Sequence, residues 1–532
     1  MDKASPQKTI DFHVCRKWLD PDIWLQIVSE CGSDDKPDRF VERIRFYGSR
    51  SGAPAYLSEL FCLEWHIQKV SNNRTKIQSD PDETTLNPSL CMVELNWKNL
   101  PGHLLHDETQ KPEPGTQLVM IWQHPKDGKV LFTPATAEDL LVLKMISEQI
   151  DQREVARQGT LPVSAIDAAI ERATAKGIIL APPSKIRRDI QGKQGVSCFD
   201  EPFLASPSFT LQWHVTQACE LHCRHCYDRS DRSPLSLEQA LGILDGMEHF
   251  CVRKHVRGQI SFSGGNPLLH PDFKAIYRAA ADRGFSLAIL GNPTSRNLLE
   301  ELVAIQVPNF FQVSLEGLPE YNDYMRGEGH FDRSLAFLDL LKELKIYSMV
   351  MLTLTKENIQ QVIPLGNLLR GKTNAFFFNR LSLVGEGASL ALPTKQEYID
   401  FLKAYQKAAR ENPILGLKDN LFNILRHEQG KEPFGGCTGF GCGAAFNFLA
   451  VLPDGEVHAC RKFPSAIGNI YSRSLEEIYD SALAERYRKG CSICIPCKLK
   501  PVCGGCLASA YSHGLNIFEQ KDPFCFLTEE PR

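Results

Sequence analysis

Three cysteines within eight residues constrain this chain more than any other feature of its sequence. They are Cys219, Cys223 and Cys226, in the segment TQACELHCRHCYDRS. Three thiols cannot all pair as disulfides, and a tetrahedral zinc site needs a fourth ligand. Iron–sulfur clusters are held by thiolates, usually four for each cluster. Three thiolates from one short loop would leave one iron with an open position for a substrate or a cofactor. For the triad taken alone, half of a zinc site is the alternative.

Composition and charge exclude several other classes of protein. A chain of 532 residues is longer than one core normally covers, so we expect about two to four domains. Its net charge of −4 gives no overall attraction to nucleic acid or to a membrane. No apolar run reaches the roughly 18 residues that span a bilayer, and the N-terminus lacks the apolar core of a signal peptide. We therefore expect a cytoplasmic protein with reduced thiols, and neither nucleic acid nor a membrane as partner.

The first 183 residues are expected to form a helical region and then a mixed one. Residues 1–80 read as helical, because Leu57, Phe61 and Trp65 recur at the spacing of one helix face. Residues 81–183 favour strands, then two helices and a short strand. This order is typical of a winged-helix-like module.

Turn residues and a change of composition divide this region further. The pair Asp127-Gly128 predicts a hairpin turn, and Gly177 predicts the end of the second helix. Residues 184–206 are polar and read as a linker. Its basic residues are expected to form a solvated surface: Lys185, Arg187, Arg188 and Lys193.

Residues 207–412 alternate between strand and helix six times. The strand candidates are FTLQWHVTQ, GQISFSGG, FSLAILGN, FFQVSLEG, YSMVMLTLT and AFFFNRLSLVG. Apolar strands that alternate with amphipathic helices indicate a parallel sheet with helices outside it. Six such units predict an α/β fold, a partial (β/α)6 barrel with its chemistry at the carboxyl ends of the strands. The cysteine triad follows the first strand, where such a site belongs.

Further motifs follow the triad in a recognisable order. SFSGGNP ends the second predicted strand, VSLEG ends the fourth, and YMRGEGHFDRS comes next. Together with the CxxxCxxC spacing, this order resembles the radical SAM superfamily. The resemblance implies that an open iron of a [4Fe–4S] cluster binds the amino and carboxylate groups of S-adenosylmethionine (SAM). Reduction by one electron would then cleave SAM to a 5′-deoxyadenosyl radical that abstracts hydrogen from a substrate.

The same resemblance implies which residues contact SAM. Gly264 and Gly265, followed by Pro267, would bring backbone to the methionine amino group. Asn266 stands where the family usually has Glu, so a neutral carbonyl would accept there in place of a carboxylate. The remaining expected contacts are Ser314 to the cofactor, Arg326 to the methionine carboxylate, and His225 and Tyr227 beside the adenine.

The C-terminal segment, residues 413–532, carries nine cysteines between Cys437 and Cys525. It is poor in apolar residues from Cys437 onward, so we expect metal to hold it together. The array resembles a SPASM domain, which carries auxiliary iron–sulfur clusters. The resemblance implies two such [4Fe–4S] clusters and three in all. The first set of ligands would be Cys437, Cys442, Cys460 and Cys506, and the second Cys494, Cys497, Cys503 and Cys525.

Two alternatives stay open for these cysteines. Cys491 is spare, and it forms with Cys494 and Cys497 the start of a ferredoxin-like run, so it could replace one of the ligands. Structural zinc is the other alternative, although the CxxC pairs lie closer together than zinc sites usually have them.

One residue and the N-terminal region bear on the substrate. Sulfatase-maturing relatives have Asp directly after the residue equivalent to Cys460, whereas this chain has Arg461. The chain is more similar to maturases of ribosomally made, post-translationally modified peptides, in particular the selenobiotic type, by its length and its CRKFPSAIGNI run. The winged-helix-like module would then be a recognition element that adds a leader peptide to its sheet as a strand. A scaffolding or dimerisation domain is the alternative, and a nucleic-acid-binding winged helix is less favoured because no basic stripe is present.

The expected activity follows from this resemblance. It is the modification of a precursor peptide, with a thioether cross-link as the leading product and a flavodoxin or ferredoxin as low-potential electron donor. Peptide epimerisation, another peptide oxidation including sulfatase maturation, and a non-catalytic electron carrier are the alternatives. No residue is predicted as a catalytic base.

Overall fold

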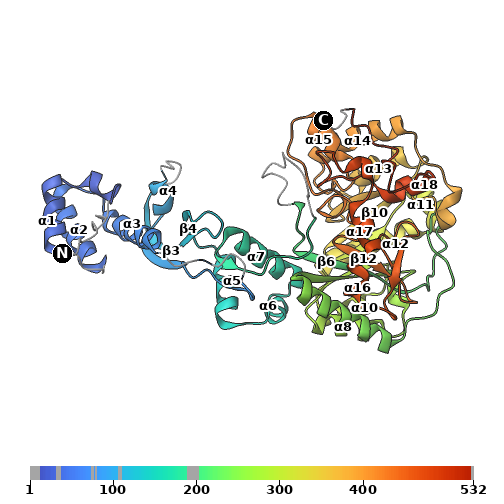
Figure 1. Cartoon of the computed structure of the whole chain (residues 1–532), viewed down its shortest axis with the longest axis horizontal. Helices are drawn as coiled ribbons and strands as arrows, with labels where there is room; N and C mark the ends of the chain where they lie inside the picture. Colours follow the sequence, from blue (N-terminus) through green and yellow to red (C-terminus); the bar gives the residue numbers. More distant parts are fainter. Residues whose placement is uncertain are drawn as a thin grey trace. The chain divides into compact units, whose positions relative to one another are not determined.

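The computed structural model describes residues 12–31, 37–73, 77, 81–105, 111–188 and 203–528. Residues 189–202, which make up most of the expected linker, lie outside the described residues. The chain divides into two compact units (Figure 1). One comprises Met1–Asp151 and Asp167–Pro182, and the other comprises Gln152–Ile166 and Pro183–Arg532.

Helices form the beginning of the first unit, as predicted. They are η1 (Cys15–Trp18), α1 (Pro21–Cys31), α2 (Pro37–Ser51) and α3 (Leu57–Asn72). Leu57, Phe61 and Trp65 are buried along α3, which confirms the predicted apolar face. The helix begins at Leu57, three residues after Pro54, and Ser51 is the last residue of α2.

A three-stranded antiparallel sheet with the order β2-β3-β4 follows these helices. Its strands are β2 (Cys91–Lys98), β3 (Glu113–Gln123) and β4 (Val130–Pro134), with α4 (Leu100–Leu104) between the first two. The hairpin from β3 to β4 turns at Gly128 with φ +68°, as predicted. Val93, Leu95 and Ile121 of the sheet belong to the same core as Phe61 of α3. The helices and the sheet therefore share one apolar core.

Three helices and a short strand complete this part of the chain. They are α5 (Ala137–Glu148), α6 (Gln152–Gly159), α7 (Val163–Lys176) and β5 (Ile179–Leu180), which pairs antiparallel with β1 (Thr85–Leu86). The sequence predicted two helices here and missed α6. That helix has eight residues, of which Val155 and Ala156 are apolar and Ala156 is buried, so it has too few apolar residues to reveal a helix face in the sequence. Gly177, with φ +78°, follows the end of α7 as predicted.

Six parallel strands in the second unit confirm the predicted partial (β/α)6 barrel. They are β6 (Ser208–Thr216), β7 (Arg257–Gly264), β8 (Ser286–Leu290), β9 (Phe310–Ser314), β10 (Ser348–Leu354) and β11 (Ala375–Arg380). Each pairs with its neighbour along the chain, from β6 to β11.

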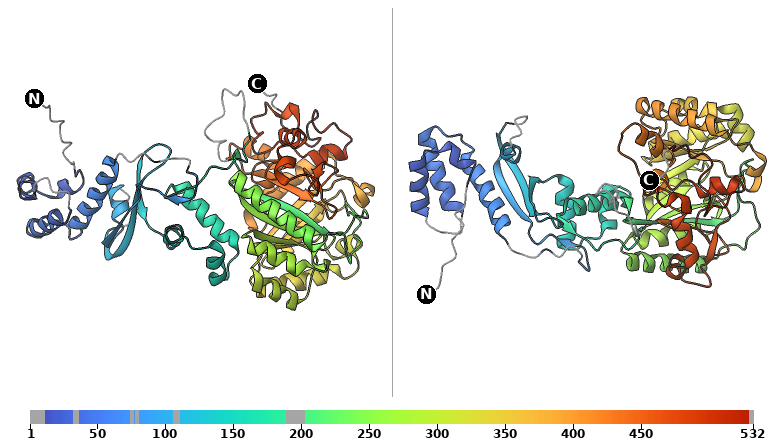
Figure 2. Two further views of the ribbon diagram at one scale, coloured as in Figure 1. Left: turned by 60° about the horizontal axis from the view of Figure 1, so that its bottom comes forward. Right: turned by 45° about the horizontal axis from the view of Figure 1, so that its top comes forward.

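Helices alternate with these strands and lie against the outside of the sheet (Figure 2). The α-helices are α8 (Leu237–Lys254), α9 (Phe273–Asp282), α10 (Arg296–Ile305), α11 (Pro319–Arg326), α12 (His330–Glu343), α13 (Val362–Leu368) and α14 (Lys395–Glu411). Short 3-10 turns η3 (Pro267–Leu269), η4 (Ile359–Gln361) and η5 (Gly385–Ser389) lie between them.

The C-terminal segment adds three strands to the barrel sheet, in the order β6-β12-β13-β14. Its elements are α15 (Phe422–Glu428), η6 (Gly436–Thr438), β12 (Phe448–Val451), β13 (Glu456–His458), β14 (Ala466–Asn469), α16 (Leu475–Tyr479), α17 (Ala482–Lys489), η7 (Ser492–Cys494) and α18 (Leu507–Ser512). β12 pairs parallel with β6, and the β12–β13 hairpin turns at Gly455 with φ +81°.

This pairing corrects the expectation that metal alone would hold the C-terminal segment. Phe446, Leu449 and Val457 of that segment are buried in the same core as Phe209 and Trp213 of β6. The segment lacks a core of its own because it shares that of the barrel. None of the described helices is long and apolar enough to cross a membrane.

Candidate iron–sulfur and SAM site

The cysteine triad lies in an irregular loop directly after β6, at the carboxyl end of the parallel sheet. Burial raises the pKa of the Cys219 and Cys223 thiols. Each of these two sulfurs accepts a hydrogen bond from another loop or helix: Asn292 Nδ2 donates to Cys219 at 3.7 Å, and Arg326 Nη1 donates to Cys223 at 3.6 Å. The strand and its neighbours therefore present all three thiols where the fold places chemistry.

Gly264 and Gly265 end β7 against the backbone of the triad loop. A Cβ on Gly264, whose φ is +138°, would lie 2.1 Å from the carbonyl oxygen of Thr216. A Cβ on Gly265 would lie 2.3 Å from that of Ala218. Only glycine leaves room for so close an approach. The two glycines thus bring the end of β7 onto the start of the loop, and their predicted contact with SAM stays a prediction.

Asn266 is buried beside these glycines, and Pro267 follows it at the start of η3. The Asn266 Nδ2 donates to both carboxylate oxygens of Glu220, at 3.0 and 3.1 Å. Its Oδ1 accepts from the backbone N–H of Leu268 at 3.3 Å. The side-chain oxygen that was expected to accept from SAM therefore already caps η3.

Arg326 and His225 meet a carboxylate that the sequence did not single out. Glu316 follows β9 and is fully buried. Arg326 donates to its Oε1 from Nε at 2.9 Å and from Nη2 at 2.6 Å, and His225 Nε2 lies 3.3 Å from the same oxygen. Burial opposes the charge of Glu316, but His225, Arg326 and the N–H of Thr353 outweigh it, so its pKa is lowered.

The predicted SAM contacts thus lie together at one end of the sheet. Burial lowers the pKa of His225 to about 4, so its ring is neutral at neutral pH. Ser314 ends β9 beside this network. The guanidinium of Arg326 is engaged by Glu316, and its contact with the methionine carboxylate stays a prediction.

Tyr227 and Asp228, the two residues after the triad, contact the C-terminal segment. The guanidinium of Arg461 lies over the Tyr227 ring, 4.1 Å from its centroid. Arg461 also donates to His214 Nε2 at 2.9 Å and to the Asp228 carboxylate at 2.8 Å. The Tyr227 hydroxyl lies 3.3 Å from the same nitrogen of His214. Arg461 is buried, so this residue joins the triad loop to the segment that carries Cys460.

The loop after β11 covers the other side of the triad. Glu386 N–H donates to the carbonyl of Cys226 at 2.8 Å. A Cβ on Gly385, with φ +55°, would lie 2.6 Å from the carbonyl oxygens of Cys226 and Tyr227. Sequence reasoning missed this contact, although Gly385 and Gly387, separated by one residue, were a signal for a close backbone approach.

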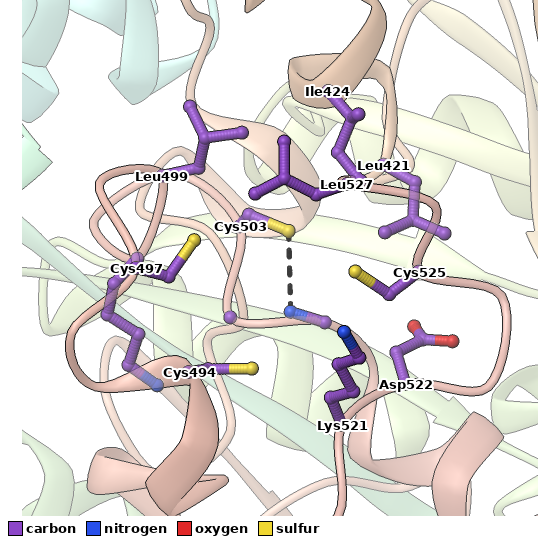
Figure 3. Close-up of a pocket in the computed structure, with 13 residues that line it drawn as sticks. Leu421, Ile424, Cys494, Cys497, Leu499, Cys503, Lys521, Asp522, Cys525 and Leu527 are labelled. Carbon is purple, nitrogen blue, oxygen red and sulfur yellow. Dashed lines mark hydrogen bonds between the residues drawn. The ribbon is translucent and has the colours of Figure 1, made fainter. Parts of the chain in front are cut away.

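The second predicted set of auxiliary ligands surrounds one cavity (Figure 3). Its lining includes all four of these cysteines: Cys494, Cys497, Cys503 and Cys525. Gly505 N–H donates to the Cys503 sulfur at 3.4 Å. Cys491 is buried, does not line the cavity, and interacts with Cys494, whose pKa is raised to about 12 by burial and then by Cys491.

The first predicted set is also brought together. Burial, and after it the nearby Cys442 and Cys506, raise the pKa of Cys460 to about 12. Cys437 and Cys460 both lie near the Lys418 ammonium, and both would favour its charged form. The four side chains come from η6, the loop after it, the end of the β12–β13 hairpin and the start of α18.

Asn420 and Arg188 support these loops and were not predicted. Asn420 Nδ2 donates to the carbonyls of Cys503 and Gly505 at 2.9 and 2.7 Å, and its Oδ1 accepts from Cys437 N–H at 2.7 Å. Arg188 donates to the carbonyl of Cys442 at 2.6 Å. Arg188 was expected on a solvated surface, and this expectation was wrong.

The reason for that error lies in two further contacts of the guanidinium. Arg188 also donates to the carbonyls of Phe440 and Arg488, at 2.9 and 3.1 Å, and lies over the Phe446 ring. Carbonyl oxygens that lack other donors favour a guanidinium, which carries five N–H groups. A basic cluster in the sequence does not reveal such a partner.

The donor chemistry of the three groups fits [4Fe–4S] clusters. Each group presents cysteine sulfur, the ligand that these clusters take, and coordination to iron removes the proton that burial makes hard to lose. Within the described residues, no three His, Cys, Asp or Glu side chains converge as the ligands of a single metal ion would. The triad would hold one cluster with an open iron, and the two sets of four would each hold a fully ligated cluster.

Two segments of the chain match known families. Residues 213–369 match the Radical SAM superfamily, and residues 442–507 match SPASM, an iron-sulfur cluster-binding domain. These residues therefore form a radical SAM domain and a SPASM domain, which makes the chain an enzyme that uses SAM and [4Fe–4S] clusters. More particularly, it carries the radical SAM domain followed by a SPASM domain that the sequence predicted.

Curated relatives match more than half of this chain at modest identity. The AdoMet-dependent heme synthase of Methanosarcina barkeri is 27% identical over 348 residues, covering 59% of this chain and 95% of that protein. The mycofactocin maturase MftC of Mycolicibacterium smegmatis is 28% identical over 337 residues, covering 59% and 82%. The antilisterial bacteriocin subtilosin biosynthesis protein AlbA of Bacillus subtilis is 26% identical over 324 residues, covering 57% and 67%.

A solved structure, Streptococcus suis SuiB bound to S-adenosylmethionine, is also similar. It is 16% identical with a TM-score of 0.47, and the match covers 77% of this chain and 96% of that one.

Proposed function

We propose that this enzyme modifies a ribosomally made precursor peptide, with a thioether cross-link as the leading product. The relatives MftC and AlbA are named for the maturation of mycofactocin and the biosynthesis of a bacteriocin, whereas another relative is named a heme synthase. The radical SAM and SPASM domains alone therefore do not select a peptide. The observation that carries the proposal is the sheet of the first unit, which has an edge strand to which a peptide can add.

That edge is β4. In the part of the chain that the structure describes, β4 pairs with β3 on one side and ends the sheet order on the other. An edge strand leaves alternate N–H and C=O groups open to another strand. Leu131 of β4 is 36% exposed and offers an apolar contact to the incoming peptide. A leader peptide would bind there as an added strand.

The proposal gives a role to each group of residues in the site. Cys219, Cys223 and Cys226 would hold the cluster that binds SAM, with His225, Tyr227 and Ser314 around the cofactor. When bound, the clusters supply the electron that cleaves SAM and accept the electron released when a carbon–sulfur bond closes. The hydrogen of the substrate carbon leaves in 5′-deoxyadenosine, and the thiol proton passes to solvent. A flavodoxin or ferredoxin would supply the first electron.

Two alternatives fit the structure less well. Peptide epimerisation needs a thiol that donates hydrogen, for which Cys251 and Cys491 are the candidates. The Cys251 sulfur is buried beside Gly258 at the amino end of β7, away from the carboxyl ends of the barrel strands. Sulfatase maturation would use a base after Cys460, and Arg461 there is engaged by His214 and Asp228.

The test is anaerobic turnover. The reconstituted and reduced protein is mixed with SAM and with the product of a small open reading frame beside its gene. We expect 5′-deoxyadenosine and methionine, and a peptide lighter by two hydrogen atoms, because a thioether replaces one C–H and one S–H bond. An unchanged peptide mass with an inverted residue would favour epimerisation. Failure to cleave SAM would favour the alternative of a non-catalytic electron carrier.

The leader site has a separate test. The substitution Leu131→Asp should weaken binding of the precursor peptide and leave SAM cleavage without peptide unchanged. Equal binding of the precursor by the variant and the parent protein would exclude β4 as the site.

A further inference from the structure

We infer that Glu220 supplies the carboxylate that binds the ammonium group of SAM in this enzyme. The inference rests on the proposed use of this site for SAM, and it names a residue that the motif would not suggest. Glu220 directly follows Cys219, the first cysteine of the triad, and is exposed on the loop. It therefore borders the place where the open iron would lie.

The first argument is that Asn266 is already engaged on both sides of its amide. Its Oδ1 accepts from Leu268 N–H, and its Nδ2 donates to both oxygens of Glu220. The two partners fix the orientation of the amide, because an N–H group requires the oxygen and a carboxylate requires the nitrogen. The cap of η3 takes one of the two lone pairs of the amide oxygen, so Asn266 has one neutral acceptor site left for an ammonium group.

The second argument is charge. An ammonium group gains about twice as much from an ionised acceptor as from a neutral one. The substitution of Asn for Glu in the motif removes a charge from position 266, and Glu220 returns one at 3.0 Å from the Asn266 side chain. A carboxylate has about four acceptor directions, and Asn266 leaves some of them for a ligand.

The third argument is that two other carboxylates near the triad, those of Asp228 and Glu316, are committed. Asp228 accepts from Arg461 at 2.8 Å. Glu316 has no exposed surface, and it accepts from Arg326 and from the backbone N–H of Thr353. It balances a buried guanidinium and cannot also bind a cation from solvent. Glu220, in contrast, is exposed and its bonding partner is neutral.

The experiment measures binding of two ligands by the reconstituted holoenzyme. One is SAM, and the other is its analogue with a hydroxyl group in place of the amino group. Equilibrium dialysis gives the dissociation constants, and the electron paramagnetic resonance spectrum of the reduced triad cluster reports the bound state. We expect Glu220→Gln to weaken SAM binding about tenfold or more and to change binding of the hydroxyl analogue less than about threefold.

A charge swap and a surface control complete the test. The double variant E220Q/N266E moves the carboxylate back to position 266 and should bind SAM within about threefold of the parent protein. Glu301→Gln, an exposed glutamate on α10 that pairs with Lys274, should bind both ligands like the parent.

Two results would overturn the inference. The first is a Glu220→Gln variant that binds SAM as tightly as the parent. The second is a variant that loses both ligands equally, because Glu220 would then only hold the loop in place. If the parent protein itself does not bind SAM, the proposed function fails together with this inference.

Discussion

Arg461 donates a hydrogen bond of 2.8 Å to the carboxylate of Asp228, although 233 residues separate the two in sequence. Asp228 lies two residues after the last cysteine of the triad, and Arg461 directly follows Cys460. The pair therefore joins the loop that would bind SAM to a ligand of the first auxiliary set.

Removing this guanidinium should destabilise the second unit. Both side chains are about nine-tenths buried, and loss of one partner of a buried pair costs about 3–5 kcal/mol. We expect Arg461→Met to lower the free energy of unfolding by about that amount, as measured by anaerobic denaturant titration. Arg473→Met, at an exposed position, should have little effect. Equal stability of both variants would show that the pair is not structural.

The cavity in Figure 3 leads to a prediction about iron content. Three four-iron clusters give about twelve iron atoms for each chain. Replacing Cys494, Cys497, Cys503 or Cys525 by Ala should lower this number by about four, because each lines the cavity. Cys491→Ala should keep the full content, since Cys491 does not line the cavity. Loss of iron from the Cys491 variant would make it a ligand.

A substitution at Gly385 would test whether the loop after β11 must pack closely against the triad loop. Alanine at this position would adopt φ +55° and place its Cβ 2.6 Å from two carbonyl oxygens of the loop. Gly371 offers a matched control, with φ +80° and open space around its Cβ position. Gly371→Ala should cost about 1–2 kcal/mol from backbone strain. Gly385→Ala should cost more and also reduce iron at the triad, as measured by iron analysis after reconstitution.

His330 at the start of α12 should make stability depend on pH. Burial lowers its pKa to about 4, and the charge of Arg326 adds to this effect. In the unfolded chain a histidine titrates near 6.5, so the unfolded state binds more protons between these values. Stability should therefore fall as the pH falls from about 6.5 toward 4.

The expected loss from His330 between pH 7 and pH 5 is about 2 kcal/mol. The variant His330→Gln cannot take up this proton, so its free energy of unfolding should fall by about that much less over the same range. If the free energy of unfolding changed with pH in the same way in the parent and the variant, groups other than His330 would cause the acid sensitivity.

Local motifs allowed much of this site to be predicted from the sequence. Three groups of residues are recognised by their spacing within short segments: the triad, the glycines at the end of β7 and the two cysteine sets. Such spacing can be read from the sequence before the fold is known. The partial barrel followed from apolar strands such as β6, whose residues Phe209 and Trp213 are fully buried.

The missed features depend on contacts that are distant in sequence. Glu220 meets Asn266 across 46 residues, and Arg188 meets Cys442 across 254. Neither pair has a pattern of its own in the sequence. The expectation that metal would hold the segment after Cys437 together failed for the same reason, because β12 pairs with β6 and shares the core of the barrel.

The pairing of β12 with β6 means that the auxiliary region cannot be cut away as a detachable module. A protein shortened after residue 412 would leave the first barrel strand with an open flank of unpaired amides and carbonyls. Such a fragment would recruit another chain along that flank and aggregate, so a mini-enzyme made from the barrel alone would first have to replace this strand.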